Sequence, residues 1–124
     1  MSKYEEHILE ILIKEKIDFI REKTFGDLKK GKYRFDFYLP KSNICIEVDG
    51  IQHTQNISYF YKNKTEFSKQ QERDRRKNSY CLAKGIKLYR IPYWAIANIK
   101  TFNDILQDSF RVKSKWHNDI LKED

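Results

Sequence analysis

The sequence has few of the residues that crosslink a chain or interrupt its secondary structure. Its 124 residues include only two cysteines, two prolines and four glycines. Cys45 and Cys81 form no Cys-x-x-Cys motif and have no histidine pair nearby, which argues against a disulfide framework and against a structural zinc site. We therefore expect a reducing, cytoplasmic setting.

Long apolar runs are also missing. The most apolar stretch, residues 8–13, is interrupted by Glu10, whereas a membrane span needs about 18 or more consecutive apolar residues. The first residues contain no apolar segment of the kind that a signal peptide carries. The sequence thus predicts neither membrane insertion nor secretion.

Aromatic and charged residues are abundant instead. Aromatic residues make up 15% of the chain and charged residues 35%, a composition that predicts one folded domain over residues 1–124 rather than a disordered polyelectrolyte. Lysine and arginine outnumber aspartate and glutamate by 25 to 18, a net charge of +7. A basic domain of this size most often binds nucleic acid, although a solvated Lys-rich surface produces the same count.

Hydrophobic patterning predicts an α/β fold with the element order αβββαβ, a mixed sheet flanked by helices, followed by a helical extension over residues 95–124. The predicted helices lie at residues 3–16 and 65–84, and the predicted strands at about 17–25, 33–38, 44–49 and 86–91. Gly85 is placed to end the second helix. In the extension, Thr101 is expected to cap a short helix, and Trp116, Ile120 and Leu121 to dock a terminal helix.

Two carboxylates are expected to face each other in the hairpin of residues 33–49. A symmetric turn over residues 39–43 places Asp36 opposite Glu47, with the Cβ atoms roughly 5 Å apart. Like charges in this position destabilise a sheet unless a metal ion or a basic side chain lies between them. The alternative is that both carboxylates lie on the solvent face of the hairpin.

Three further residues are candidates for the same site. His53 follows Asp49 and Gly50 closely enough to reach back over the strand end, where an imidazole suits general acid–base chemistry, although a lone histidine is more often structural. Asp74 is at the centre of a polar stripe on the predicted second helix, which indicates either a polar site or a solvated helix held by charge pairs. Glu5 either borders the site or only completes a capping box with Ser2.

Two segments resemble a known nuclease family. They are YRFDFYLPKSNICIEVDGIQH and QERDRRKNSYCLAKGIKLYRIPYW, which contain the motifs F-D-F-Y-L-P, I-E-x-D-G-x-Q-H and R-D-x-x-K-N in order. The chain resembles the Vsr-like branch of the PD-(D/E)XK nuclease superfamily, with an E-D-x-H-D site, over residues 2–94. The resemblance implies a restriction-endonuclease-like αβββαβ core.

The resemblance also implies a set of site residues. The catalytic positions of the family fall on Glu5, Asp36, Glu47, His53 and Asp74. One departure concerns the lysine that the superfamily carries two residues after its second acid, because Asp49 stands there. Its task would pass either to His53 or to Lys77.

The expected function is metal-dependent hydrolysis of DNA to products with 5′-phosphate ends. Asp36, Glu47 and the main-chain carbonyl of Val48 would hold Mg²⁺ or Mn²⁺, His53 oriented by Asp74 would transfer the proton, and Glu5 would position a water molecule. Candidate contacts to double-stranded DNA are Lys69, Arg73, Arg75, Arg76, Lys77, Tyr59 and Tyr61.

One site in a small domain is expected to nick DNA as a monomer and to cut both strands only as a homodimer or in two events. The expected setting is the cytoplasm of a bacterium or a phage-infected cell. The alternative from another class is a DNA-binding or inhibitor protein that keeps the nuclease fold without its activity. The presence of all five acidic and histidine positions favours the enzyme.

Overall fold

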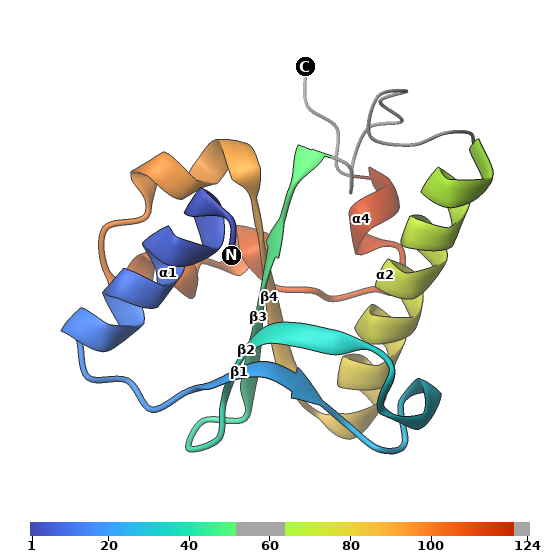
Figure 1. Cartoon of the computed structure of the whole chain (residues 1–124), viewed down its shortest axis with the longest axis horizontal. Coiled ribbons are helices and arrows are strands. Elements are labelled where there is room, and N and C mark those ends of the chain that lie inside the picture. Colours follow the sequence, from blue (N-terminus) through green and yellow to red (C-terminus); the bar gives the residue numbers. More distant parts are fainter. Residues whose placement is uncertain (52–63, 121–124) are drawn as a thin grey trace.

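The computed structural model describes residues 1–51 and 64–120. A central sheet separates two long helices that lie on its opposite faces (Figure 1). The elements, in chain order, are α1 (Lys3–Lys14), β1 (Ile20–Thr24), η1 (Lys29–Gly31), β2 (Arg34–Leu39), β3 (Ile44–Asp49), α2 (Lys64–Lys84), β4 (Lys87–Pro92), η3 (Tyr93–Asn98), α3 (Phe102–Ile105), η4 (Asp108–Phe110) and α4 (His117–Ile120). The predicted order αβββαβ and the helical extension are confirmed.

The sheet has four strands in the order β1-β2-β3-β4. The first three pair antiparallel, whereas β3 and β4 run parallel, a pairing that needs a crossover connection such as α2. The pairs Phe37–Ile46 and Leu39–Ile44 confirm the predicted hairpin register. Gly85 ends α2 with a positive φ of 70°, as expected of a helix C-cap glycine.

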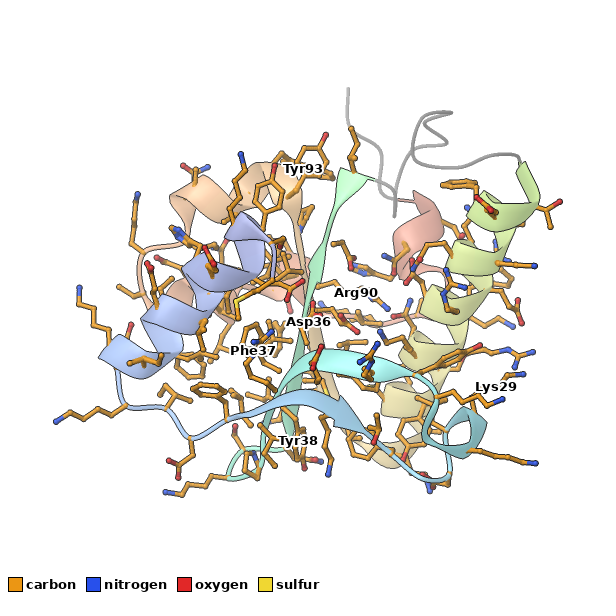
Figure 2. The ribbon with its side chains drawn as sticks, in the orientation of Figure 1. Lys29, Asp36, Phe37, Tyr38, Arg90 and Tyr93 are labelled. Atoms are coloured by element: carbon orange, nitrogen blue, oxygen red, sulfur yellow. The ribbon has the colours of Figure 1, made fainter. Side chains whose placement is uncertain are left out.

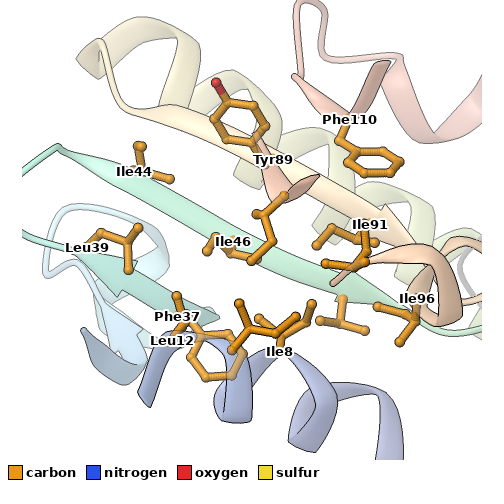
Figure 3. Close-up of a cluster of buried hydrophobic side chains, with 14 residues drawn as sticks. Ile8, Leu12, Phe37, Leu39, Ile44, Ile46, Tyr89, Ile91, Ile96 and Phe110 are labelled. Carbon is orange, nitrogen blue, oxygen red and sulfur yellow. The ribbon is translucent and has the colours of Figure 1, made fainter. Parts of the chain in front are cut away.

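Strand β3 is buried along its whole length because both faces of the sheet are covered. Alternate residues of a strand point to opposite faces. Ile44, Ile46 and Val48 pack in the apolar core with α1 (Figure 3). Cys45, Glu47 and Asp49 therefore face α2, where Cys45 packs with Cys81. This face carries two carboxylates into the interior.

The C-terminal part differs most from expectation. The docked helix reduces to α4, and Trp116 precedes it with 47% of its surface exposed, so its expected docking is wrong. The indole lies 4.9 Å from the Arg75 guanidinium and 4.6 Å from the Lys115 ammonium, and these cation contacts suit a half-exposed ring. The buried residue here is Asn118. Leu121 lies outside the described residues.

Smaller differences occur at element ends. α1 stops at Lys14 rather than residue 16, and Lys16 adopts a positive φ of 58° that a helix does not allow. The helical extension predicted over residues 95–124 begins slightly earlier, with the 3-10 helix η3 at Tyr93. Thr101 caps α3 in a full capping box with Asp104, as expected. Among the described helices, none has the length and apolarity needed to cross a membrane.

Candidate active site

One cavity gathers most of the acidic residues that the sequence indicates. It has a volume of about 500 Å³ and lies where the first turn of α1, the strands β2 and β3, α2 and the start of η3 meet. Its described lining residues are Ser2, Tyr4, Glu5, Arg34, Asp36, Glu47, Val48, Gly50, Ile51, Lys77 and Tyr93. Glu5, Asp36, Glu47 and Val48 are thus brought together from three separate elements.

Asp36 and Glu47 form the centre of this site. The Asp36 Oδ2 accepts a hydrogen bond of 2.7 Å from the Val48 main-chain N–H, and Glu47 is 4% exposed. Burial, followed by the negative charge of Glu47, raises the pKa of Asp36 well above its ordinary value. Burial would also raise the pKa of Glu47, but the positive charges of Lys77 and Arg90 outweigh it and lower that pKa. Glu47 is therefore buried, and Asp36 is half-buried beside it in the cavity wall, so the pair does not lie on an open solvent face.

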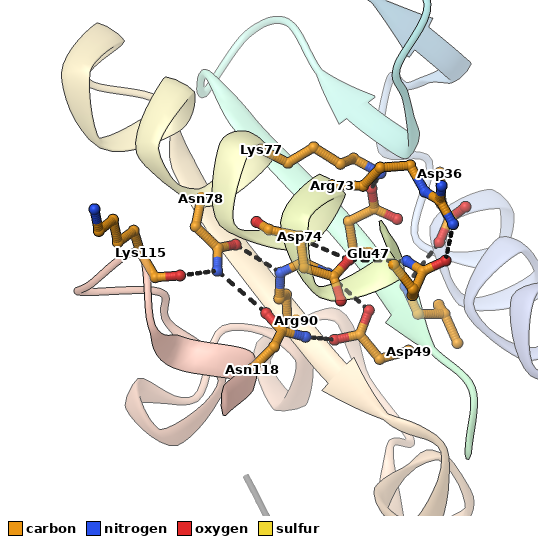
Figure 4. Close-up of polar contacts among 12 residues, drawn as sticks. Asp36, Glu47, Asp49, Arg73, Asp74, Lys77, Asn78, Arg90, Lys115 and Asn118 are labelled. Carbon is orange, nitrogen blue, oxygen red and sulfur yellow. Dashed lines mark hydrogen bonds and ion pairs between the residues drawn. The ribbon is translucent and has the colours of Figure 1, made fainter. Parts of the chain in front are cut away.

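Lys77 supplies the basic side chain that such a pair requires. It comes from α2, forms an ion pair with Glu47 and is 13% exposed. Its ammonium also lies 5.0 Å from the centre of the Phe35 ring, an arrangement that attracts a cation to the ring face. Of the two residues expected to replace the superfamily lysine, Lys77 is therefore beside the carboxylates (Figure 4).

Glu5 serves both of the roles considered for it. Its main-chain N–H donates to the Ser2 Oγ at 3.2 Å, which caps α1. Its carboxylate lines the cavity and accepts a hydrogen bond of 3.3 Å from the Arg21 guanidinium. The capping interaction fixes the helix start, and Arg21 holds the carboxylate beside Asp36.

Asp74 occupies a different place from the other acids. It is 1% exposed and is not among the described residues that line the cavity, and the Gln70 side-chain amide donates to it at 3.1 Å. Its Oδ1 is 3.6 Å from the Arg90 guanidinium. The predicted inward polar stripe of α2 is therefore real, but in the described residues it meets a buried arginine.

Arg90 is the centre of a polar network that the sequence did not reveal. Its fully buried guanidinium donates to Asp49 and to Asn78, each at 2.8 Å (Figure 4). Asn118 donates to the other Asp49 oxygen at 2.8 Å. Burial would lower the pKa of Arg90, but the surrounding carboxylates, first Asp49, raise it. The available signal was Asp49, which stands where the resemblance leads one to expect a lysine, since a buried carboxylate needs a cation.

The predicted nucleic-acid contacts divide between two surfaces. Arg73 lines a groove of about 320 Å³ that adjoins the cavity and shares Arg34, Asp36 and Lys77 with it. Arg75 instead pairs with Asp119 at 2.9 Å and Arg76 with Glu72 at 2.8 Å, away from the carboxylates. Lys69 is exposed on α2. His53, Tyr59 and Tyr61 lie outside the described residues.

The donor set fits a hard divalent cation. Asp36 and Glu47 offer carboxylate oxygens beside the main chain of Val48, and oxygen is the donor that Mg²⁺ and Mn²⁺ prefer. Over the described ranges there is no ready-made cluster of three or more acidic, histidine or cysteine ligands.

Comparison with known proteins finds viral relatives of unassigned activity. No family model matches the chain, and no solved structure matches it. It is 33% identical over 90 residues to uncharacterized protein 307L of Invertebrate iridescent virus 6, covering 72% of this chain and 45% of that protein. It is also 33% identical over 81 residues to uncharacterized protein 094L of Frog virus 3 (isolate Goorha), covering 64% of this chain and 52% of that protein. The chain spans about half the length of these curated relatives.

Proposed function

We propose that this chain is a metal-dependent DNA endonuclease that hydrolyses phosphodiester bonds at the Asp36–Glu47 cavity. The observation that carries the proposal is the pairing of half-buried Asp36 with buried Glu47, with Lys77 and Glu5 around the same cavity. Perturbed carboxyl pKa values beside a specific charge partner are typical of functional sites. Fold stability alone does not account for two adjacent carboxylates facing an open cavity.

Asp36, Glu47 and the carbonyl of Val48 are the residues that would hold Mg²⁺ or Mn²⁺. Such an ion, when bound, polarises the scissile phosphate and offsets the charge that develops in the transition state. Glu5 is placed to accept a hydrogen bond from the attacking water, since its carboxylate lines the cavity and Arg21 fixes its position. His53 stays a candidate for proton transfer.

Lys77 stabilises negative charge on the phosphate in this proposal. Its ammonium lies in the cavity wall, is largely buried and stays close to Glu47. A preorganised cation in a site with little water stabilises developing charge more strongly than an exposed one. In the adjoining groove, Arg34 and Arg73 are placed to bind neighbouring phosphates of the DNA backbone.

The test is cleavage of supercoiled plasmid by the purified protein in Mg²⁺, in Mn²⁺ and in EDTA. Asp36→Asn keeps the side-chain size and removes the charge, and Asp108→Asn is the matched control because that carboxylate is exposed. We expect metal-dependent nicking that falls about 100-fold or more in Asp36→Asn and stays unchanged in Asp108→Asn. Equal cleavage by both variants, or cleavage in EDTA, would refute the proposal. Salt-sensitive DNA binding without cleavage would indicate the non-catalytic alternative.

A further inference from the structure

An aromatic wall faces the carboxylates across the candidate active site. Tyr4, in the first turn of α1, and Tyr93, at the start of η3, both line the cavity. Their ring centres are 6.1 Å apart, and Trp94 packs edge-on against Tyr93 at 5.4 Å. Figure 2 shows Tyr93 beside the first turn of α1, at the end of the sheet that bears the site. Neither tyrosine has a part in the proposed hydrolysis.

The parallel pairing of β3 and β4 explains this placement. Asp49 is paired with Pro92, so the two strands end side by side. The residues that follow them, Gly50 and Tyr93, therefore line the same cavity. Ligand sites in sheets with parallel strands commonly form beyond the carboxyl ends of those strands. Tyr93 is thus held at the mouth of the site by the topology of the sheet.

The cations of the cavity come from the other side of the fold. Arg34 and Lys77 belong to β2 and α2, whereas the tyrosines belong to α1 and η3, which cover the opposite face of the sheet (Figure 1). The adjoining groove adds the cations of Lys32 and Arg73 and the carboxylate of Glu22 to this lining. A ligand that fills this space contacts the aromatic rings of α1 and η3, the cations of β2 and α2, and the carboxylates of Asp36 and Glu47 in the same lining.

A nucleotide of a free strand matches this arrangement better than one in a duplex. It presents a phosphate to one side and an unpaired base face to the other, whereas paired bases stay stacked inside a duplex and leave only backbone for contact. We propose that Tyr93, supported by Tyr4, stacks on an unpaired base next to the phosphate that is cleaved. The substrate class is then single-stranded or locally unpaired DNA. This inference rests on the proposed function and narrows the double-stranded substrate expected from the sequence.

The test uses a single-stranded oligonucleotide with one 2-aminopurine, whose fluorescence falls when the base stacks. Binding is measured with Ca²⁺ in place of Mg²⁺, on Asp36→Asn as well as on the unchanged protein, so that the readout needs no cleavage. We expect quenching on binding of the strand, and weaker binding of the same sequence as a duplex. Tyr93→Leu should weaken strand binding by about 5- to 150-fold and abolish the quenching, whereas Tyr93→Phe, which keeps the ring, should preserve both.

The controls separate this inference from the endonuclease proposal. Trp116→Leu removes an exposed aromatic residue outside the cavity and should change nothing. The stacking site would be overturned if 2-aminopurine fluorescence did not fall when the strand binds the protein without substitutions, or if strand and duplex bound with equal affinity. Loss of quenching in Trp116→Leu instead of in Tyr93→Leu would also overturn it, even if plasmid is cleaved. Tyr93-dependent quenching without any cleavage of plasmid or oligonucleotide would support the stacking site and refute the endonuclease.

Discussion

Replacing Arg90 with methionine should destabilise the protein more than any surface substitution. The guanidinium is fully buried and pairs with Asp49 at 2.8 Å, and both Asp49 and Asp74 are 1% exposed. Methionine fills similar space without charge, so two buried carboxylates would lose their cation. Removing one partner of a buried ion pair costs about 3–5 kcal/mol, a large part of the roughly 5–15 kcal/mol that stabilises a domain.

Urea unfolding measures this loss directly. At about 2 kcal/mol per molar urea, the expected loss lowers the unfolding midpoint by roughly 2 M. Arg21→Met is the matched control, because its ion pair with Glu5 has side chains 31% and 26% exposed and partly exposed pairs contribute only up to about 1 kcal/mol. In Arg90→Met combined with Asp49→Asn, we expect the two losses to be smaller than additive. Equal midpoints for Arg90→Met and Arg21→Met, or strict additivity in the double variant, would refute the network as a source of stability.

Three further outcomes follow from single contacts. Lys77→Met should lower metal-dependent cleavage at least tenfold, because it removes the cation beside Glu47. The near-ultraviolet circular dichroism should stay native, because the fold is kept. Burial lowers the pKa of His117 below its ordinary 6.5, so the unfolded chain takes up the proton first. The contribution of His117 to the free energy of unfolding should therefore be lost as the pH drops below 6.5, and the difference between the unchanged protein and His117→Gln should vary with pH in that sense. Cys45 and Cys81 are fully buried, and contact with Cys81 together with burial raises the pKa of Cys45. Ellman's reagent should therefore react slowly with the native protein, whereas in urea it should react readily with both thiols.

The hairpin that presents the carboxylates could be predicted because its rules are local. A short turn between alternating segments sets the register, and the register sets which side chains meet. The inward polar face of α2 was also visible from helical spacing alone. The first pattern was enough to bring Asp36 and Glu47 together, whereas the second placed Asp74 at the centre of a polar stripe without deciding between a polar site and a solvated face.

The roles of Arg90 and Tyr93 could not be predicted, because they depend on the pairing of strands that lie far apart in the sequence. In IKLYRI, Arg90 shares its strand face with Ile86 and Leu88, but an arginine side chain does not itself indicate burial. Its burial follows from the parallel pairing of β4 with β3, which covers both faces of β4. Tyr93 reaches the cavity only because β4 ends beside β3. The prediction that Trp116 docks the terminal helix was wrong for another reason. Helical spacing does not distinguish a ring that docks from one that packs between cations.

The most direct measurement is the origin of the oxygen in the product. A defined oligonucleotide is incubated with the protein and Mg²⁺ in ¹⁸O-labelled water, and the fragments are analysed by mass spectrometry. Hydrolysis at the Asp36–Glu47 cavity predicts fragments with a 5′-phosphate that carries one ¹⁸O, and none of them with Asp36→Asn. Intact oligonucleotide under all conditions, or labelled fragments of equal yield from Asp36→Asn, would contradict it.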